Sequence, residues 1–157
     1  MKNVSSDLLH TSTLFNGLHK EDIRKICAQG RFEDFEKGDI IIREGQKTPC
    51  LCLLLEGSAD VILPKIGKDF ERIDNVDLSR KKTGDCFGEY SFLDGKPASA
   101  TVVAVETCKI FAITKENFME FLESDDFLAK RIYYNLSRIF VKKMREVVED
   151  SETFILL

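Results

Sequence analysis

The sequence of 157 residues contains no tryptophan, only three prolines and only two histidines. The histidines, His10 and His19, both precede the β-rich part of the chain, so the histidine cluster of a metalloenzyme barrel is not available. No apolar run approaches the roughly 18 residues that cross a membrane, and segment 1–13 has no apolar signal-peptide centre. We therefore expect a cytosolic protein with no membrane segment and no catalytic metal.

The chain also has no excess of basic residues. It carries 23 Lys and Arg against 27 Asp and Glu, for a net charge of -4 and a pI near 5.3. Proteins that bind a phosphate backbone need clustered basic residues, so nucleic acid is not an expected partner. The basic groups at 81–82 and 142–145 have acidic neighbours and are interpreted as solvated faces.

Five cysteines at irregular spacings are typical of reduced thiols rather than of a disulfide framework. Cys86 has no histidine nearby to activate it and is interpreted as inert. The hydrophobic fraction of 43% and the charged fraction of 32% are ordinary for a globular protein. We expect a single domain over residues 1–157.

Helical periodicity is found at both ends of the chain and is missing between them. Near the N-terminus, Ile23, Ile26 and Cys27 follow the polar segment 19–22, and Gly30 is placed to end a short helix. From about residue 32 to 114, short β-rich runs alternate with glycine turns: Ile40–Ile42, Leu51–Leu55, Ala59–Leu63, Phe70–Ile73 and Thr101–Val105. This pattern predicts a mainly β fold with flanking helices, a double-stranded β-helix or jelly-roll barrel of about eight strands.

Two helices are predicted after the barrel, over about residues 115–150. Thr114 can cap the first, and Ser124 or Asp125 can cap a longer one that reaches about Asp150. The longer helix carries an apolar stripe at spacings of three and four: Ile132, Leu136, Ile139, Phe140, Met144 and Val147. We expect its first half to pack on the barrel, and its second half to extend beyond the barrel and favour self-association.

The segment 83–102 is the candidate binding site. Gly88 allows a close backbone approach, and a helical turn beginning at Glu89 would point N–H groups at an anion. Glu89 is the only acid that we expect in this concavity; it either accepts hydrogen bonds from ligand hydroxyls or satisfies neighbouring backbone N–H groups. The candidate ligand-binding residues are Phe87, Gly88, Glu89, Tyr90, Ser91, Ala98, Ser99 and Ala100.

Phe87, Gly88 and Glu89, followed by Pro97 and by Ala100 to Val102, resemble the phosphate-binding cassette of the cyclic nucleotide-binding domain family, which includes catabolite-activator-like sensor domains. Further matches lie at 14–18, 37–45 and 53–61, and the similarity covers roughly residues 14–145. It implies a barrel that binds cAMP or cGMP, with a ribose hydroxyl on Glu89. The family also places an arginine directly after the proline to bind the cyclic phosphate, and here that position is Ala98.

Loss of this arginine should weaken binding at least about tenfold, since one partner of a buried charged pair contributes about 2–5 kcal/mol. Lys96 could replace the charge, but we expect it to lie in an exposed turn. Two hypotheses therefore remain. The chain is a regulatory sensor module, neither an enzyme nor dependent on a cofactor, in which a ligand or partner at the cassette shifts a hinge near 118–126 and the last helix. Alternatively, the pocket is vestigial and the domain is a scaffold that binds a protein or dimerises through residues 128–148.

Overall fold

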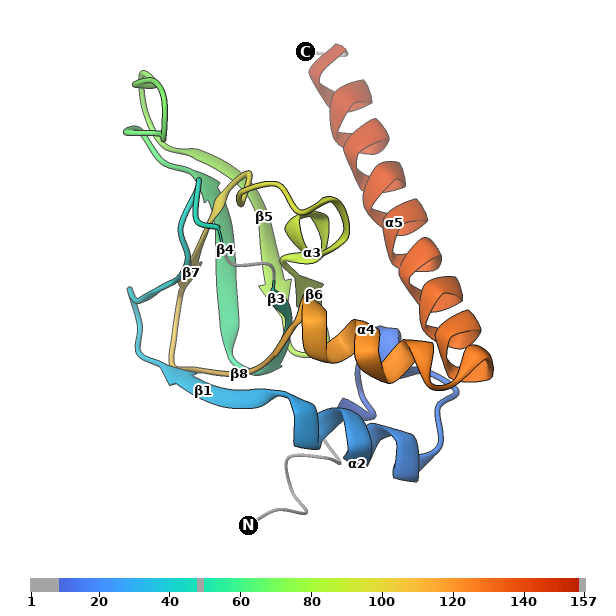
Figure 1. Ribbon diagram of the computed structural model, residues 1–157. Coiled ribbons are helices and arrows are strands. Elements are labelled where there is room, and N and C mark those ends of the chain that lie inside the picture. The colour runs from blue at the N-terminus through green and yellow to red at the C-terminus, as the bar shows by residue number, and fades with distance from the viewer. Residues whose placement is uncertain (1–8, 48–49, 156–157) are drawn as a thin grey trace.

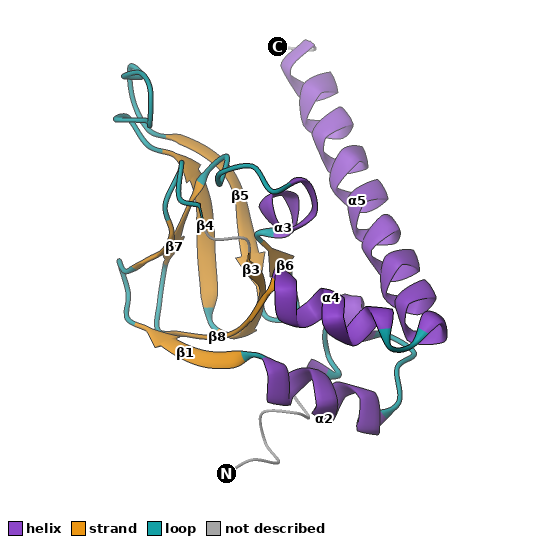
Figure 2. Cartoon of the chain, in the orientation of Figure 1, coloured by secondary structure: helices purple, strands orange, loops and turns teal. Residues whose placement is uncertain are grey.

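The computed structural model describes residues 9–47 and 50–155, with side chains up to residue 151. The described residues form eight strands in two antiparallel four-stranded sheets, with most of the helices gathered at one end (Figures 1 and 2). One sheet has the order β1-β8-β3-β6 and consists of Arg31–Phe35, Cys108–Thr114, Cys50–Glu56 and Cys86–Phe87. The other has the order β2-β7-β4-β5 and consists of Ile40–Ile42, Thr101–Ala104, Ser58–Leu63 and Val76–Lys82. The predicted jelly-roll-like fold is confirmed, although the described strands form two sheets and not a closed barrel.

Both faces of strand β3 are buried, so this strand lies in the interior of the molecule. Leu51, Leu53 and Leu55 join the cluster that faces the helices, whereas Cys52 and Leu54 join the cluster between the two sheets. A strand that is covered on both sides needs a continuous apolar run and not an alternating one. This explains the sequence CLCLLL over 50–55.

The predicted end of the first helix and the predicted starts of the two C-terminal helices are confirmed. Helix α2 (Lys20–Gln29) ends before Gly30, and helix α4 (Lys115–Glu123) begins after Thr114, whose hydroxyl accepts the Asn117 N–H at 3.3 Å. Helix α5 (Asp126–Ile155) begins after Asp125, whose Oδ1 accepts the Leu128 N–H at 3.1 Å. Side-chain acceptors for free N–H groups stabilise helix starts, so these ends follow from local chemistry. Helix α5 extends past the predicted end near residue 150.

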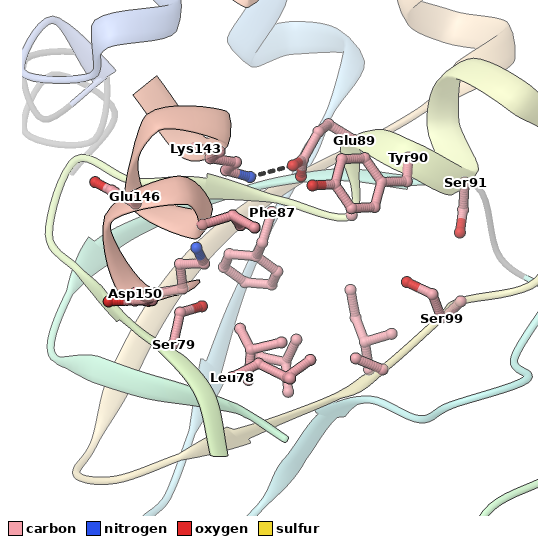
Figure 3. A pocket seen from close by; sticks show the side chains of 18 residues that line it. Leu78, Ser79, Phe87, Glu89, Tyr90, Ser91, Ser99, Lys143, Glu146 and Asp150 are labelled. Carbon is pink, nitrogen blue, oxygen red and sulfur yellow. Dashed lines mark hydrogen bonds and ion pairs between the residues drawn. The ribbon is translucent and has the colours of Figure 1, made fainter. Parts of the chain in front are cut away.

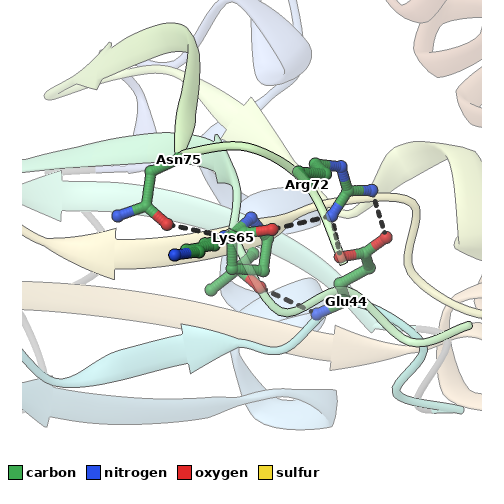
Figure 4. A network of polar contacts seen from close by, with 6 residues as sticks. Glu44, Lys65, Arg72 and Asn75 are labelled. Carbon is green, nitrogen blue, oxygen red and sulfur yellow. Dashed lines mark hydrogen bonds and ion pairs between the residues drawn. The ribbon is translucent and has the colours of Figure 1, made fainter. Parts of the chain in front are cut away.

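The strand predicted at Phe70–Ile73 is wrong: this segment belongs to the loop of the β4–β5 hairpin, and the strand lies at Val76–Lys82. Strand β5 is at the edge of its sheet and mostly exposed, so it has no apolar periodicity. The Arg72 guanidinium holds the loop through bonds of 2.9 and 3.1 Å to the Glu44 carboxylate and 2.8 Å to the Pro64 carbonyl (Figure 4). Apolar side chains of the loop remain in solvent, with Ile73 fully exposed.

The first half of α5 is fixed to the body of the protein, as predicted. Leu128, Ile132 and Leu136 are buried in the cluster between the first sheet and the helices. The buried Asn135 side chain donates to the carbonyls of Leu14 and Asn16, at 2.8 and 2.9 Å, beside the short helix η1 (Thr13–Phe15). From this anchored base, the rest of α5 rises past the sheets (Figure 1). In the described chain, no helix has both the length and the hydropathy to cross a membrane.

Candidate ligand-binding site

A cavity of about 330 Å³ lies between the second sheet, the segment 87–100 and the second half of α5. All eight residues predicted as ligand-binding line it: Phe87, Gly88, Glu89, Tyr90, Ser91, Ala98, Ser99 and Ala100. Its volume is at the lower end of the range for pockets that hold small organic ligands. Ile42, Val61 and Val102 contribute apolar walls, so the cavity has an apolar body with a few polar groups.

Gly88 sets the geometry of this segment. It has a φ of 77° and precedes helix α3 (Glu89–Asp94), which makes its first helical bond from the Phe92 N–H to the Gly88 carbonyl at 3.1 Å. A Cβ at this position would lie 2.5 Å from the Cys50 carbonyl oxygen. Both the left-handed backbone and the close packing therefore require glycine here. The result is that Glu89 starts α3 with its side chain at the cavity and only 3% exposed.

Glu89 is paired with a lysine from the far end of the chain. The Lys143 Nζ donates to Glu89 Oε1 (Figure 3). The partner of the Glu89 carboxylate is therefore a lysine side chain, and neither of the two expected roles, a free acceptor for ligand hydroxyls or an acceptor for backbone N–H groups, describes it. Burial alone would lower the pKa of Lys143, but attraction to Glu89 and the hydrogen bond outweigh it and raise the pKa above its ordinary value of 10.5. Tyr90 adds a second contact between α3 and α5, because its ring stacks on Phe140 at 5.9 Å.

Helix α5 and strand β5 contribute residues to the cavity that the sequence interpretation missed. The expectation of a single acid is wrong, since Glu146 and Asp150 also line the cavity. The interpretation of the basic groups as solvated faces is wrong for Lys81 and Lys143, which line the cavity and are partly buried. The spacing of 143, 146 and 150 places these side chains on one face of a helix, a signal that could have been read from the sequence.

Position 98, where the resemblance predicts a phosphate-binding arginine, faces the cavity. Ala98 is half-buried and lines it, and its carbonyl and N–H bond to Gly45 and Gln46 at 2.7 and 3.0 Å. Lys96 is exposed, as expected, and is not among the lining residues. Cys86 is buried as a free thiol, and burial raises its pKa to about 12, consistent with the predicted inertness.

The sequence model of the cyclic nucleotide-binding domain matches residues 32–125, which is more than half of the chain and includes the whole cassette. The chain belongs to the cyclic nucleotide-binding domain family. The human potassium/sodium hyperpolarization-activated cyclic nucleotide-gated channel 1 is 31% identical to this chain over 116 residues. The match covers 74% of this chain and 12% of the channel. The cyclic AMP receptor protein of Thermus thermophilus is 27% identical over 135 residues, covering 86% of this chain and 58% of that protein.

Solved structures of cyclic nucleotide-binding domains share the fold. A domain from Methylobacillus flagellatus superposes with a TM-score of 0.78 at 22% identity, covering 92% of this chain and 78% of that one. The catabolite activator protein of Thermus thermophilus superposes with a TM-score of 0.74 at 22% identity, covering 91% of this chain and 63% of that one. The chain therefore spans between about an eighth and somewhat over half of the length of the curated relatives quoted above.

Proposed function

We propose that this domain is a regulatory module that binds cAMP or cGMP in the cavity beside α3 and transmits occupancy through α5. The observation that carries the proposal is that one cavity is lined both by all eight cassette residues and by the second half of α5. Relatives that are named for binding or responding to cyclic nucleotides support the choice of ligand. The apolar walls would take the base, and Glu89 would accept a ribose hydroxyl.

The bond between Glu89 and Lys143 links the ligand to the helix. A ribose hydroxyl that donates to Glu89 has to share or displace the Lys143 ammonium, which is carried by α5. A ligand that interacts differently with two positions of α5 shifts the balance between them. The hinge would lie near 118–126, from the second half of α4 to the first residue of α5.

The test is a calorimetric titration of the purified protein with cAMP and cGMP, beside an Ala98→Arg variant. We expect weak binding by the native chain, and binding tighter by at least about tenfold in the variant, because a charge-assisted hydrogen bond contributes about 1.5–3 kcal/mol. Failure of the native chain to bind either nucleotide at millimolar concentration would contradict the proposal, and binding by Ala98→Arg alone would locate the loss at position 98.

A second candidate function is a ligand-independent scaffold that binds a protein or a second copy through residues 128–148. It is favoured by exposed apolar side chains on the second half of α5, with Val141 55%, Met144 66% and Val148 51% exposed. Sedimentation of the native chain with and without nucleotide tests it, beside Met144→Gln and the control Lys142→Gln. A dimer that persists without ligand and is weakened only by Met144→Gln would support the scaffold, whereas a monomer in every case would speak against self-association.

The single domain over 1–157, the cytosolic location, the lack of a cofactor and the lack of enzymatic activity stay predictions. What supports the last is that the relatives quoted above are named as a gated channel and a receptor protein.

A further inference from the structure

Two cations reach the cavity, and neither comes from the cassette. The lining includes Lys81 of β5 and Lys143 of α5, whereas position 98 contributes only a methyl group. No arginine is found among the described lining residues. An anionic ligand in this cavity would therefore meet a lysine or no positive side chain at all.

The two lysines differ in their partners. Lys143 already has a carboxylate, since it is bonded to the buried Glu89. Lys81 is partly buried, and within the described chain its ammonium has no hydrogen bond or ion pair. Burial, reinforced by the nearby charge of Lys143, lowers the pKa of Lys81, although Glu89 and Asp85 oppose this shift. The Glu89–Lys143 pair is neutral as a unit. The carboxylates of Glu146 and Asp150 also line the cavity, but neither is bonded to Lys81, so among the described residues Lys81 is the lining cation with a free ammonium.

The register and the alternation of strand β5 explain why Lys81, and not Lys82, lines the cavity. Lys81 pairs with Ala59 of β4 across the sheet, and the small partner leaves room for its side chain. Lys82 is the next residue along the strand, so its side chain points to the opposite face, and it is exposed and not among the lining residues.

We propose that Lys81 binds the anionic group of the ligand, the phosphodiester monoanion of a cyclic nucleotide, in place of the missing cassette arginine. This inference rests on the proposed function, because it names the residue that makes binding in that same cavity possible. A lysine can act as a phosphate-binding point charge, although it lacks the planar fork of arginine. The phosphodiester would then supply the bonded partner that this partly buried ammonium lacks.

The experiment compares Lys81→Met with the matched control Lys82→Met, which removes the same charge from the same strand. Each protein is titrated with cAMP, cGMP, adenosine and guanosine, and binding is followed by NMR chemical shifts, which detect millimolar affinities. Loss of one charge-assisted hydrogen bond predicts an affinity for the cyclic nucleotide lowered about 10- to 100-fold in Lys81→Met. Nucleoside affinity should not change in either variant, Lys82→Met should bind like the native chain, and Lys81→Arg should retain binding.

Each other outcome overturns the inference in a recognisable way. If the native chain binds a cyclic nucleotide and Lys81→Met binds it equally well, the role of Lys81 is refuted while the proposed function stands. If Lys81→Met weakens nucleosides and cyclic nucleotides alike, the residue shapes the cavity and does not bind the anion. If the native chain binds no cyclic nucleotide, the proposed function fails and this inference fails with it. Circular dichroism checks folding, and Lys81→Gln replaces Lys81→Met if the latter does not fold.

Discussion

Replacing Lys143 with methionine should destabilise the domain by about 2–3 kcal/mol, because it leaves the Glu89 carboxylate buried without its cation. Removing one partner of a fully buried ion pair costs roughly 3–5 kcal/mol. We expect somewhat less here, since the Lys143 side chain is 21% exposed and water reaches part of the pair, while Glu89 is only 3% exposed. For a domain of this size, the melting temperature should fall by about 4–12 °C.

The assay is thermal and urea unfolding of Lys143→Met beside Lys142→Met. Lys142 is the neighbouring residue on α5, its side chain is 76% exposed, and its contact with Glu146 is 3.9 Å long, so its removal should change stability little. Adding Glu89→Gln to Lys143→Met should recover part of the loss, because the double variant no longer holds the buried Glu89 carboxylate without its cation. Equal stability of the two single lysine variants would refute the reasoning.

The pH dependence of this pair follows from the sign of the shift. The pKa of Lys143 is raised in the folded state above 10.5, so its contribution is fully present below that pH and is lost only as the pH rises through the raised pKa. The stability difference between the native chain and Lys143→Met should therefore be the same at pH 7 and pH 9. It should shrink only in strongly alkaline solution.

Three further predictions concern the frame of the site. Gly88→Ala should lower the urea midpoint far more than Gly38→Ala: both backbones are left-handed, but an added Cβ meets a carbonyl oxygen only at Gly88 and open space at Gly38. Arg72→Met should make the β4–β5 loop a site of rapid cleavage in limited proteolysis, because the bonds that hold it are lost. It should also lower the thermal transition, because the Glu44 carboxylate, only 12% exposed, loses its cation. At pH 8, Cys86 should stay unmodified by a thiol reagent until urea unfolds the chain. The half-buried Cys27, whose pKa is raised to about 11 by burial, should react slowly. Mass spectrometry distinguishes the two thiols, and equal rates would contradict the burial argument.

Some elements could be predicted because their signals are local. A cap residue, an apolar spacing of three and four and a terminating glycine lie within a few residues of each other, and α2, α4 and the start of α5 follow from them. The cassette was also predictable, since Gly88 through Ala100 form one continuous segment and all its candidate residues line one cavity.

Strand β5 was not predictable because an exposed edge strand has no apolar pattern to reveal it, whereas the apolar loop at 70–73 has a strand-like composition. Because strand β5 was not predicted, the position of Lys81 in the cavity was not predicted either, since it depends on the register of β5 against β4.

By itself, the sequence determined the class of fold, the end of α2, the starts of α4 and α5, and the cassette with Ala98 in it, because each depends on neighbouring residues. Only the tertiary structure decided how the cavity is completed. Glu89 and Lys143 are far apart in the chain, and they meet because Asn135 and the buried leucines and isoleucine of α5 fix the start of a helix that then passes α3. The pairing of the Glu89 carboxylate with Lys143 depends on that long-range packing, because a charge is compensated by whichever group the fold brings near it.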